Sequence, residues 1–166
     1  MNPFQASFFK FSRHPFKFGY YLFIKLPAAF FSGIRVKQIS EDVCVTCVPF
    51  KWLTQNPFKS TYFASLAMAA EMSTGLLALS NIYKRDLRIS MLVIKMEATY
   101  FKKATGSTCF TCTQGQEFTS VIEQAIHTGE AKTIIAKSTG VNKMNEMVAE
   151  FAITWSFKAR SENGTA

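Results

Sequence analysis

Two segments of the chain alternate apolar and polar side chains with a period of two, which is typical of a strand with one buried face. They cover residues 149–158 and 94–100. Residues 43–48, 108–113 and 131–138 are rich in β-branched side chains, which also favours strands. The apolar positions that we expect to face the core are Ala149, Phe151, Ile153, Trp155 and Phe157 in the first segment and Ile94, Met96, Ala98 and Tyr100 in the second.

A long apolar helix is predicted for residues 60–83, which are rich in Ala, Leu and Met and carry a single charge, Glu71. The segment is apolar nearly all round, and such a helix is buried on most sides. It is long enough to span a bilayer, but a carboxylate at mid-membrane is costly. We therefore interpret it as the buried helix of a soluble domain.

A shorter helix is predicted after residue 117. Apolar side chains recur there at helical spacing, Ser120 and Glu123 have the spacing of a capping box, and Gly129 fits a C-terminal stop. The order of elements is then N-terminal helix or helices, strand, long helix, two strands, short helix and two strands. This is an α+β layout, and a mostly antiparallel sheet has to curve to cover the long helix.

The N-terminus is rich in phenylalanine and cationic. Nine of the 17 Phe fall in the first 31 residues, together with Lys10, Arg13, Lys17 and Lys25 and no acid. These cations interrupt the apolar residues too often for a secretory signal or a membrane-spanning helix. The net charge of +8 would suit nucleic acid, but no nucleic-acid motif is present, so we expect no nucleic-acid partner.

We interpret residues 1–30 as one or two amphipathic helices, broken at Pro15 and Pro27, whose Phe face packs on the rest of the domain. This helical extension is expected to cover an open end or edge of the sheet, where it would shape a ligand pocket. A helix lying on a membrane surface is the alternative, which we favour less. The polar residues 161–166 are expected to form a loose tail.

Four cysteines form two C-x-x-C pairs, Cys44 with Cys47 and Cys109 with Cys112. Paired C-x-x-C motifs often bind zinc. Both pairs lie in predicted strands, however, where residues i and i+3 point to opposite faces. We therefore expect buried strand cysteines and no metal site, and we expect no disulfide in a chain without a secretion signal.

Nucleophile motifs are scarce. The chain has no G-x-S-x-G elbow, no phosphate-binding loop and only two histidines, His14 and His127. Glu71 is the remaining candidate, because a lone carboxylate in an apolar helix has to be neutral, hydrogen-bonded or functional. One interpretation is a structural role at a helix–helix or subunit contact, where Glu71 finds a backbone or hydroxyl partner, with Ser73 and Thr74 nearby in sequence. The other is a general base facing a pocket.

The segment from Asn56 to Gly75 resembles the signature of hotdog-fold thioesterases, and in particular the PaaI-type acyl-CoA thioesterases and their bacterial relatives. In those families an Asn precedes the central helix, an acid follows fifteen residues later, and a Gly lies four positions further on, as Asn56, Glu71 and Gly75 do here. Tyr100 and Ala104 also match a Tyr-x-x-x-Ala pattern. The resemblance covers about four-fifths of the chain and implies a hotdog domain over residues 31–160.

The resemblance implies a cytoplasmic homodimer or homotetramer that hydrolyses an acyl-CoA or acyl-carrier thioester between subunits. Coenzyme A would enter as part of the substrate, with no separate cofactor. Glu71 would activate water or attack the carbonyl, and Asn56 would orient the water beside backbone N–H groups at the helix start. Lys102 and Lys103 are candidate contacts for the CoA phosphates.

The chain also departs from the PaaI-type pattern at the helix start. Where those proteins carry His-Gly-Gly, this sequence has Tyr62, Phe63 and Ala64, which we take as substrate-binding positions. Val93 lies near the strand position where some relatives have a catalytic Ser. A hotdog protein that binds an acyl or aromatic ligand without turnover is therefore the alternative function.

Overall fold

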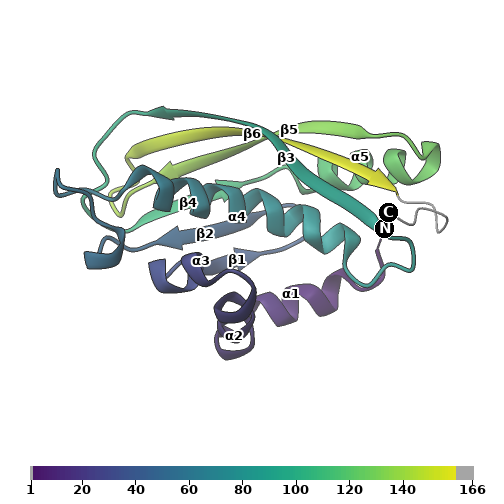
Figure 1. The fold of residues 1–166 in the computed structure, drawn as a ribbon, viewed down its shortest axis with the longest axis horizontal. Helices are drawn as coiled ribbons and strands as arrows, with labels where there is room; N and C mark the ends of the chain where they lie inside the picture. Colours follow the sequence, from purple (N-terminus) through teal and green to yellow (C-terminus); the bar gives the residue numbers. More distant parts are fainter. Residues whose placement is uncertain (1, 160–166) are drawn as a thin grey trace.

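The computed structural model describes residues 2–159 and contains one six-stranded antiparallel sheet that curves around a central helix (Figure 1). The strand order is β1-β2-β4-β5-β6-β3. The central helix is α4 (Phe63–Ile82). The strands are β1 (Arg35–Ile39), β2 (Cys44–Val48), β3 (Ile89–Tyr100), β4 (Thr108–Cys112), β5 (Lys132–Val141) and β6 (Met147–Ala159). The predicted α+β class and the sheet wrapped around the long helix are confirmed.

The sheet encloses α4 because the helix is apolar on nearly every side. Its few hydroxyl groups find partners: Ser73 shares a 2.7 Å hydrogen bond with Ser138, and Thr74 accepts one of 2.9 Å from the indole N–H of Trp155. Within residues 2–159, α4 is the one helix whose length and composition would suffice to cross a membrane. Most of its surface is buried against the sheet, as expected for the core helix of a soluble domain.

The second predicted helix is α5 (Gly115–Thr128), which packs against β5, β6 and the C-terminal part of α4. Gly129 ends it in the left-handed conformation, as predicted. The predicted capping box is wrong, because Ser120 lies inside the helix. The helix begins earlier, at Gly115, where a methyl group would lie only 1.7 Å from the backbone oxygen of Glu41. Glu123 instead pairs with Arg85 at 2.5 Å.

The N-terminus forms three short helices, α1 (Gln5–Arg13), α2 (Pro15–Lys25) and α3 (Pro27–Ser32). The two prolines stand at the first positions of α2 and α3, where a missing N–H costs nothing. The amide of Asn2 donates to the carbonyl groups of Ser80 and Tyr83 at 2.9 and 2.8 Å and so ties α1 to the end of α4. Phe8, Phe9, Phe18 and Leu22 are buried, so one face of these helices packs on the domain as expected.

The domain boundary at residue 30 stays a prediction, and the expected loose tail at 161–166 lies outside the described residues. The short strand β1 was not predicted, because its sequence, RVKQI, carries too many polar side chains for a strand pattern. It is an edge strand, and edge strands commonly carry such charges.

The predicted buried face of β3 is also wrong, since Ile94, Met96, Ala98 and Tyr100 are all exposed. Two causes combine. A bulge between Val93 and Lys95 places Ile94 outside the pairing with β6, and β3 is the other edge of the sheet. No element within residues 2–159 pairs with its outer edge.

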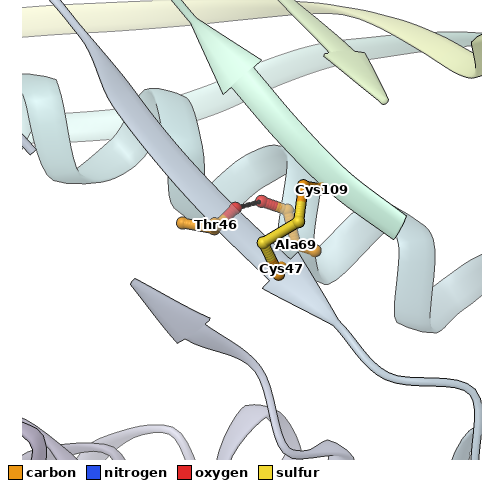
Figure 2. The surroundings of a disulfide bond; sticks show 4 residues. All are labelled: Thr46, Cys47, Ala69 and Cys109. Carbon is orange, nitrogen blue, oxygen red and sulfur yellow. Dashed lines mark hydrogen bonds between the residues drawn. A yellow bond between two sulfur atoms is a disulfide. The ribbon is translucent and has the colours of Figure 1, made fainter. Parts of the chain in front are cut away.

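A disulfide joins Cys47 of β2 to Cys109 of β4, contrary to the expectation of no disulfide (Figure 2). The two residues lie directly opposite each other across the antiparallel pair, with Cα atoms 4.0 Å apart. Cys44 and Cys112 form a second opposed pair on these strands, and both are free, buried thiols. Thr46, the neighbour of Cys47, points instead to α4, where its hydroxyl donates to the carbonyl of Ala69 at 2.6 Å (Figure 2).

The register of β2 and β4 explains this outcome. Equal C-x-x-C spacings on opposed antiparallel strands bring both cysteines of one strand against those of the other. Strand alternation places one pair on each face. Burial is the main cause that raises the pKa of Cys44 well above its ordinary value and the pKa of Cys112 to about 11, so both thiols stay protonated and unreactive at neutral pH.

We expect reduction of the disulfide to destabilise the fold. The bond closes a loop between residues 62 positions apart, which corresponds to about 4 kcal/mol of unfolded-state entropy. Urea unfolding of the protein with and without dithiothreitol measures this difference. The control is the variant C47S/C109S, whose stability should match that of the reduced protein and should not respond to the reductant.

Alkylation without reduction should label two cysteines and alkylation after reduction four, once the protein is unfolded. Equal stability with and without reductant would contradict a stabilising disulfide. The same alkylation on protein taken directly from cells tests the cytoplasmic location expected from the sequence. Structural disulfides are rare in reducing compartments, so an intact disulfide in cells would argue against that location.

Candidate functional site

Asn56 organises the loop that precedes α4. Its side-chain oxygen accepts hydrogen bonds from the backbone N–H groups of Phe58 and Ser60 at 3.0 and 3.2 Å, and from the hydroxyl of Ser60 at 3.2 Å. Lys59, between them, has a positive φ of 56°, which closes a tight turn. No acceptor within residues 2–159 binds the amide nitrogen of Asn56, so this group keeps its capacity to donate.

A pocket of about 500 Å³ opens beside this loop and contains most of the residues predicted to bind substrate. Asn56, Tyr62, Phe63, Lys102 and Lys103 all line it. Ala64, the remaining predicted position, is half-buried in the first turn of α4 and does not line the pocket. The structure therefore brings together residues from the loop before α4 and from the segment after β3.

The start of α4 contributes backbone donors to this region. Tyr62 precedes the helix and provides no side-chain cap, so N–H groups of the first turn are left for water or a ligand. A helix N-terminus also carries a partial positive charge. The rings of Tyr62 and Phe63 lie 4.7 Å apart and are about half exposed, so they form an aromatic edge to the pocket.

The two lysines at the pocket differ in their charge environment. Lys102 forms an ion pair of 2.5 Å with Glu146, whose carboxylate also accepts from the amide of Asn142. Lys103 is exposed and makes no ion pair within residues 2–159. Lys103 is therefore the cation of this pocket that remains free to attract an anionic ligand.

Glu71 lies in a different pocket, of about 100 Å³, on the face of α4 that is turned toward the N-terminal helices. Gly75 lines the same pocket, one turn further along α4. A methyl group at Gly75 would lie 3.0 Å from the carboxylate oxygen Oε1 of Glu71, so the glycine leaves room for the carboxylate beside the helix.

Within residues 2–159 the Glu71 carboxylate has no hydrogen-bond donor, and desolvation raises its pKa above the ordinary value. Neither of the two neighbouring hydroxyl groups, Ser73 and Thr74, is the partner of this carboxylate, and a contact with a second subunit stays a prediction. Ser73 donates to the carbonyl of Ala70, and Thr74 donates to the backbone carbonyl of Glu71 itself. The carboxylate is therefore half-buried among apolar groups, which is the setting in which a carboxylate can act as a base near neutral pH.

The N-terminal helices supply pocket residues that the sequence did not indicate individually. Phe18, Tyr21 and Leu26 line the Glu71 pocket together with residues of α4 and Met91 of β3. The sequence feature that could have indicated them is the helical spacing of the apolar residues Phe18, Tyr21 and Leu22 along one side of α2. Tyr100 and Phe101, at the end of β3, line the larger pocket and were missed as well.

Within one chain, Asn56 and Glu71 therefore do not share a pocket. The nine residues from Tyr62 to Glu71 correspond to about 13 Å along the axis of α4. Glu71 lies beside α2, whereas Asn56 lies beyond the start of the helix, next to the end of β3.

This curved antiparallel sheet around a long apolar helix defines a hotdog fold, the architecture of the hotdog thioesterases. The chain belongs to the family described as domain of unknown function DUF4442, which residues 19–157 match. A comparison with curated proteins gives no significant match.

Several solved structures share the fold. A Pseudomonas aeruginosa protein of unknown function, described as a "probable thioesterase", is 18% identical with a TM-score of 0.74 over 91% of this chain and 95% of its own. A Chlorobaculum tepidum protein of unknown function is 14% identical, with a TM-score of 0.73 over 90% and 99% of the two chains. A Haemophilus influenzae thioesterase is 14% identical, with a TM-score of 0.62 over 86% and 90%.

We expect Glu71→Gln to stabilise the protein at neutral and alkaline pH. The folded state raises the pKa of Glu71, so between the unfolded value of 4.5 and the folded value only the native state holds the proton. Stability then falls as pH rises through that window, and glutamine removes this penalty. Urea unfolding of both proteins at several pH values measures the difference, which should vanish near pH 4.

The matched control is Glu97→Gln, on exposed β3, which should not show this pH-dependent gain. A Glu71→Gln variant that loses stability equally at pH 4 and pH 8 would mean that the carboxyl group makes a favourable contact in the folded protein, whatever its charge.

Proposed function

We propose that this protein is a thioesterase that hydrolyses an acyl-CoA or acyl-carrier thioester. The single observation that carries the proposal is the Glu71 carboxylate, which lies in an apolar pocket without a hydrogen-bond donor and has a raised pKa. Such a group costs stability, and a cost of this kind is typical of functional sites. The hotdog fold, shared with proteins described as thioesterases, supports the same reaction class.

In the reaction we propose, Glu71 takes a proton from water, and the oxygen of that water adds to the thioester carbonyl carbon. The tetrahedral intermediate then collapses, the carbon–sulfur bond breaks, and the proton passes to the departing thiolate. Direct attack by the Glu71 carboxylate, followed by hydrolysis of the anhydride, is the other route the geometry leaves open. Both need a carboxylate that is ionised and poorly solvated.

Donors for the developing oxyanion would come from the start of α4. The uncapped N–H groups of the first turn and the free amide of Asn56 lie at the same pocket. Preorganised donors of this kind contribute strongly to acyl transfer. Lys103 would contact a phosphate of the CoA or carrier group, whereas Lys102 is already paired with Glu146. No separate cofactor is needed for this chemistry.

Because Asn56 and Glu71 lie in different pockets of one chain, we place the reaction between two subunits, with Asn56 from one and Glu71 from the other. The edge strand β3 supports such an assembly. No strand within residues 2–159 pairs with its outer edge, and Met96 and Tyr100 are exposed although they lie opposite the inward-facing Ile153 and Ala149 of β6. A second β3 would cover these side chains and complete the ladder. A homodimer or a tetramer built from it satisfies this requirement.

The alternative function is binding of an acyl or aromatic ligand without turnover. The observation that favours it is the pair Tyr62 and Phe63, whose bulky rings stand at the start of α4 where PaaI-type relatives have His and Gly. Rings at this position would stack on an aromatic ligand and would hinder approach of a carbonyl to the backbone donors.

We expect the protein to release free thiol from at least one of a panel of short, long and aromatic acyl-CoA substrates. Glu71→Gln should lower kcat by roughly 100-fold or more, since a general base contributes that much. Asn56→Ala should lower it by about 10-fold or more through loss of an oriented donor. A thiol-reactive dye measures the release, and Glu117→Gln, exposed on α5 and away from β3, is the matched carboxylate control.

Thiol release that is unchanged in Glu71→Gln would contradict the role of Glu71. No release from any substrate, combined with saturable binding of an acyl-CoA, would instead support the ligand-binding alternative. In that case Tyr62→Ala should weaken binding and Glu71→Gln should not.

We expect the assembly to depend on β3. Met96→Glu should shift the protein toward monomer by about 10-fold or more in dissociation constant, because it places like charges opposite each other at a paired edge. Sedimentation velocity over a concentration series measures this. Ile135→Glu, an exposed apolar position of similar kind on β5, should leave the assembly unchanged. A monomeric wild-type protein that still releases thiol would contradict the shared site.

A further inference from the structure

Helix α2 carries apolar side chains on two opposite faces. Phe18 and Leu22 are buried on the inner face, against the domain. On the outer face, Phe16, Tyr20, Phe23 and Ile24 follow the spacing i, i+4, i+7 and i+8, and they are 84%, 68%, 49% and 51% exposed. This spacing confines the four side chains to roughly 100° of the helix circumference, so they form one continuous stripe.

The stripe continues onto α3 through a cluster of three phenylalanine rings. The ring of Phe23 lies 5.3 Å from that of Phe30 and 6.2 Å from that of Phe31, and the last two rings are 5.4 Å apart. Phe30 and Phe31 are also exposed, at 38% and 53%. Figure 1 shows α2 projecting from the side of the molecule opposite β5 and β6. Six exposed apolar side chains on α2 and α3 thus form one contiguous patch, and such a patch marks an interaction surface.

The charged side chains of the segment that carries this surface are all cationic. Residues 2–40 contain six cations and no acid, and the first acid in the chain is Glu41. Lys17 and Lys25 of α2 are exposed, and neither forms an ion pair within residues 2–159. The guanidinium of Arg13 donates to the backbone carbonyl of Ile39 and forms no ion pair in the described part of the chain.

We propose that the outer face of α2 and α3 binds the surface of an anionic phospholipid bilayer. Aromatic and aliphatic side chains would enter the boundary between headgroups and acyl chains, while the lysines would reach anionic headgroups. A second copy of this chain fits the surface less well. A two-fold contact would bring Lys17 and Lys25 against the same unpaired cations of the partner.

Co-sedimentation with vesicles tests this proposal. The full chain should bind vesicles of phosphatidylcholine with about 30% phosphatidylglycerol at least 10-fold more tightly than pure phosphatidylcholine, and added salt should weaken the binding. Phe16→Ser with Ile24→Ser should lower the partition coefficient by about 10-fold or more, because two apolar side chains no longer enter the bilayer. Lys17→Glu with Lys25→Glu should remove the preference for anionic vesicles.

The matched controls lie on β5 and its following turn, on the far side of the molecule. Ile135→Ser, and Lys137→Glu with Lys143→Glu, should bind vesicles within about twofold of the wild-type protein. All substituted side chains are exposed, and unchanged thermal unfolding would show that each variant is folded.

Absence of binding to the anionic vesicles, or equal loss of binding in the control variants, would overturn the proposal. Self-association that Phe16→Ser with Ile24→Ser abolishes, without vesicle binding by the wild-type protein, would assign the surface to a second copy instead. Vesicle binding needs no substrate, and Glu71→Gln should bind as the wild-type protein does. Failure of this proposal is therefore distinguishable from failure of the proposed thioesterase activity.

Discussion

The fold depends on the burial of one helix, α4, that has almost no polar face. A helix of this kind is stable in water only if other elements surround it, and a single twisted sheet can do so only by curving. The inward-facing side chains of β2, β4, β5 and β6 accordingly pack against it. Two specific contacts fix its rotation within the sheet, namely Thr46 to the carbonyl of Ala69 and Trp155 to Thr74. Each satisfies a polar group that burial would otherwise penalise.

Glu71 is the exception to this arrangement. Every hydroxyl group near it is satisfied by another partner, whereas its carboxylate has none within residues 2–159. A leucine or methionine at this position would avoid the desolvation cost, as Met72 and Leu76 do on neighbouring positions. Gly75 adds to the argument, since a side chain there would crowd both the carboxylate of Glu71 and the ring of Trp155. The two positions together keep an ionisable group in an apolar pocket, and stability alone does not account for that combination.

The sequence pattern predicts central strands and apolar helices well, and much of the fold consists of these elements. β6 is paired on both sides and faces α4, so its period-two pattern coincided with the buried positions. β3 has the same pattern, but it is an edge strand with a bulge. The alternation shows which side chains share a face of the sheet, but it does not show whether another element covers that face. The start of α5 is set by the close approach of Gly115 to Glu41, a tertiary contact with no local signal.

For the candidate site, too, the sequence indicates local positions but not their tertiary placement. The resemblance to hotdog thioesterases named Asn56, Glu71 and Gly75 as candidates, because its spacing covers one loop and one helix. Which pocket each residue enters depends on the placement of α2 and of the segment after β3, and neither is encoded near these positions. The disulfide has a related cause, since it follows from the register between β2 and β4, whereas the spacing within each C-x-x-C pair describes one strand alone.

Helix α2 connects the two unusual features of the molecule. Its inner face supplies Phe18 and Tyr21 to the pocket of Glu71, and its outer face carries the exposed stripe. An amphipathic helix needs only one apolar face to pack on a domain, so the second face has to be explained by something outside residues 2–159. The helix is eleven residues long and is held mainly by that inner face. Whatever covers the stripe therefore also restrains the wall of the pocket in which the carboxylate lies.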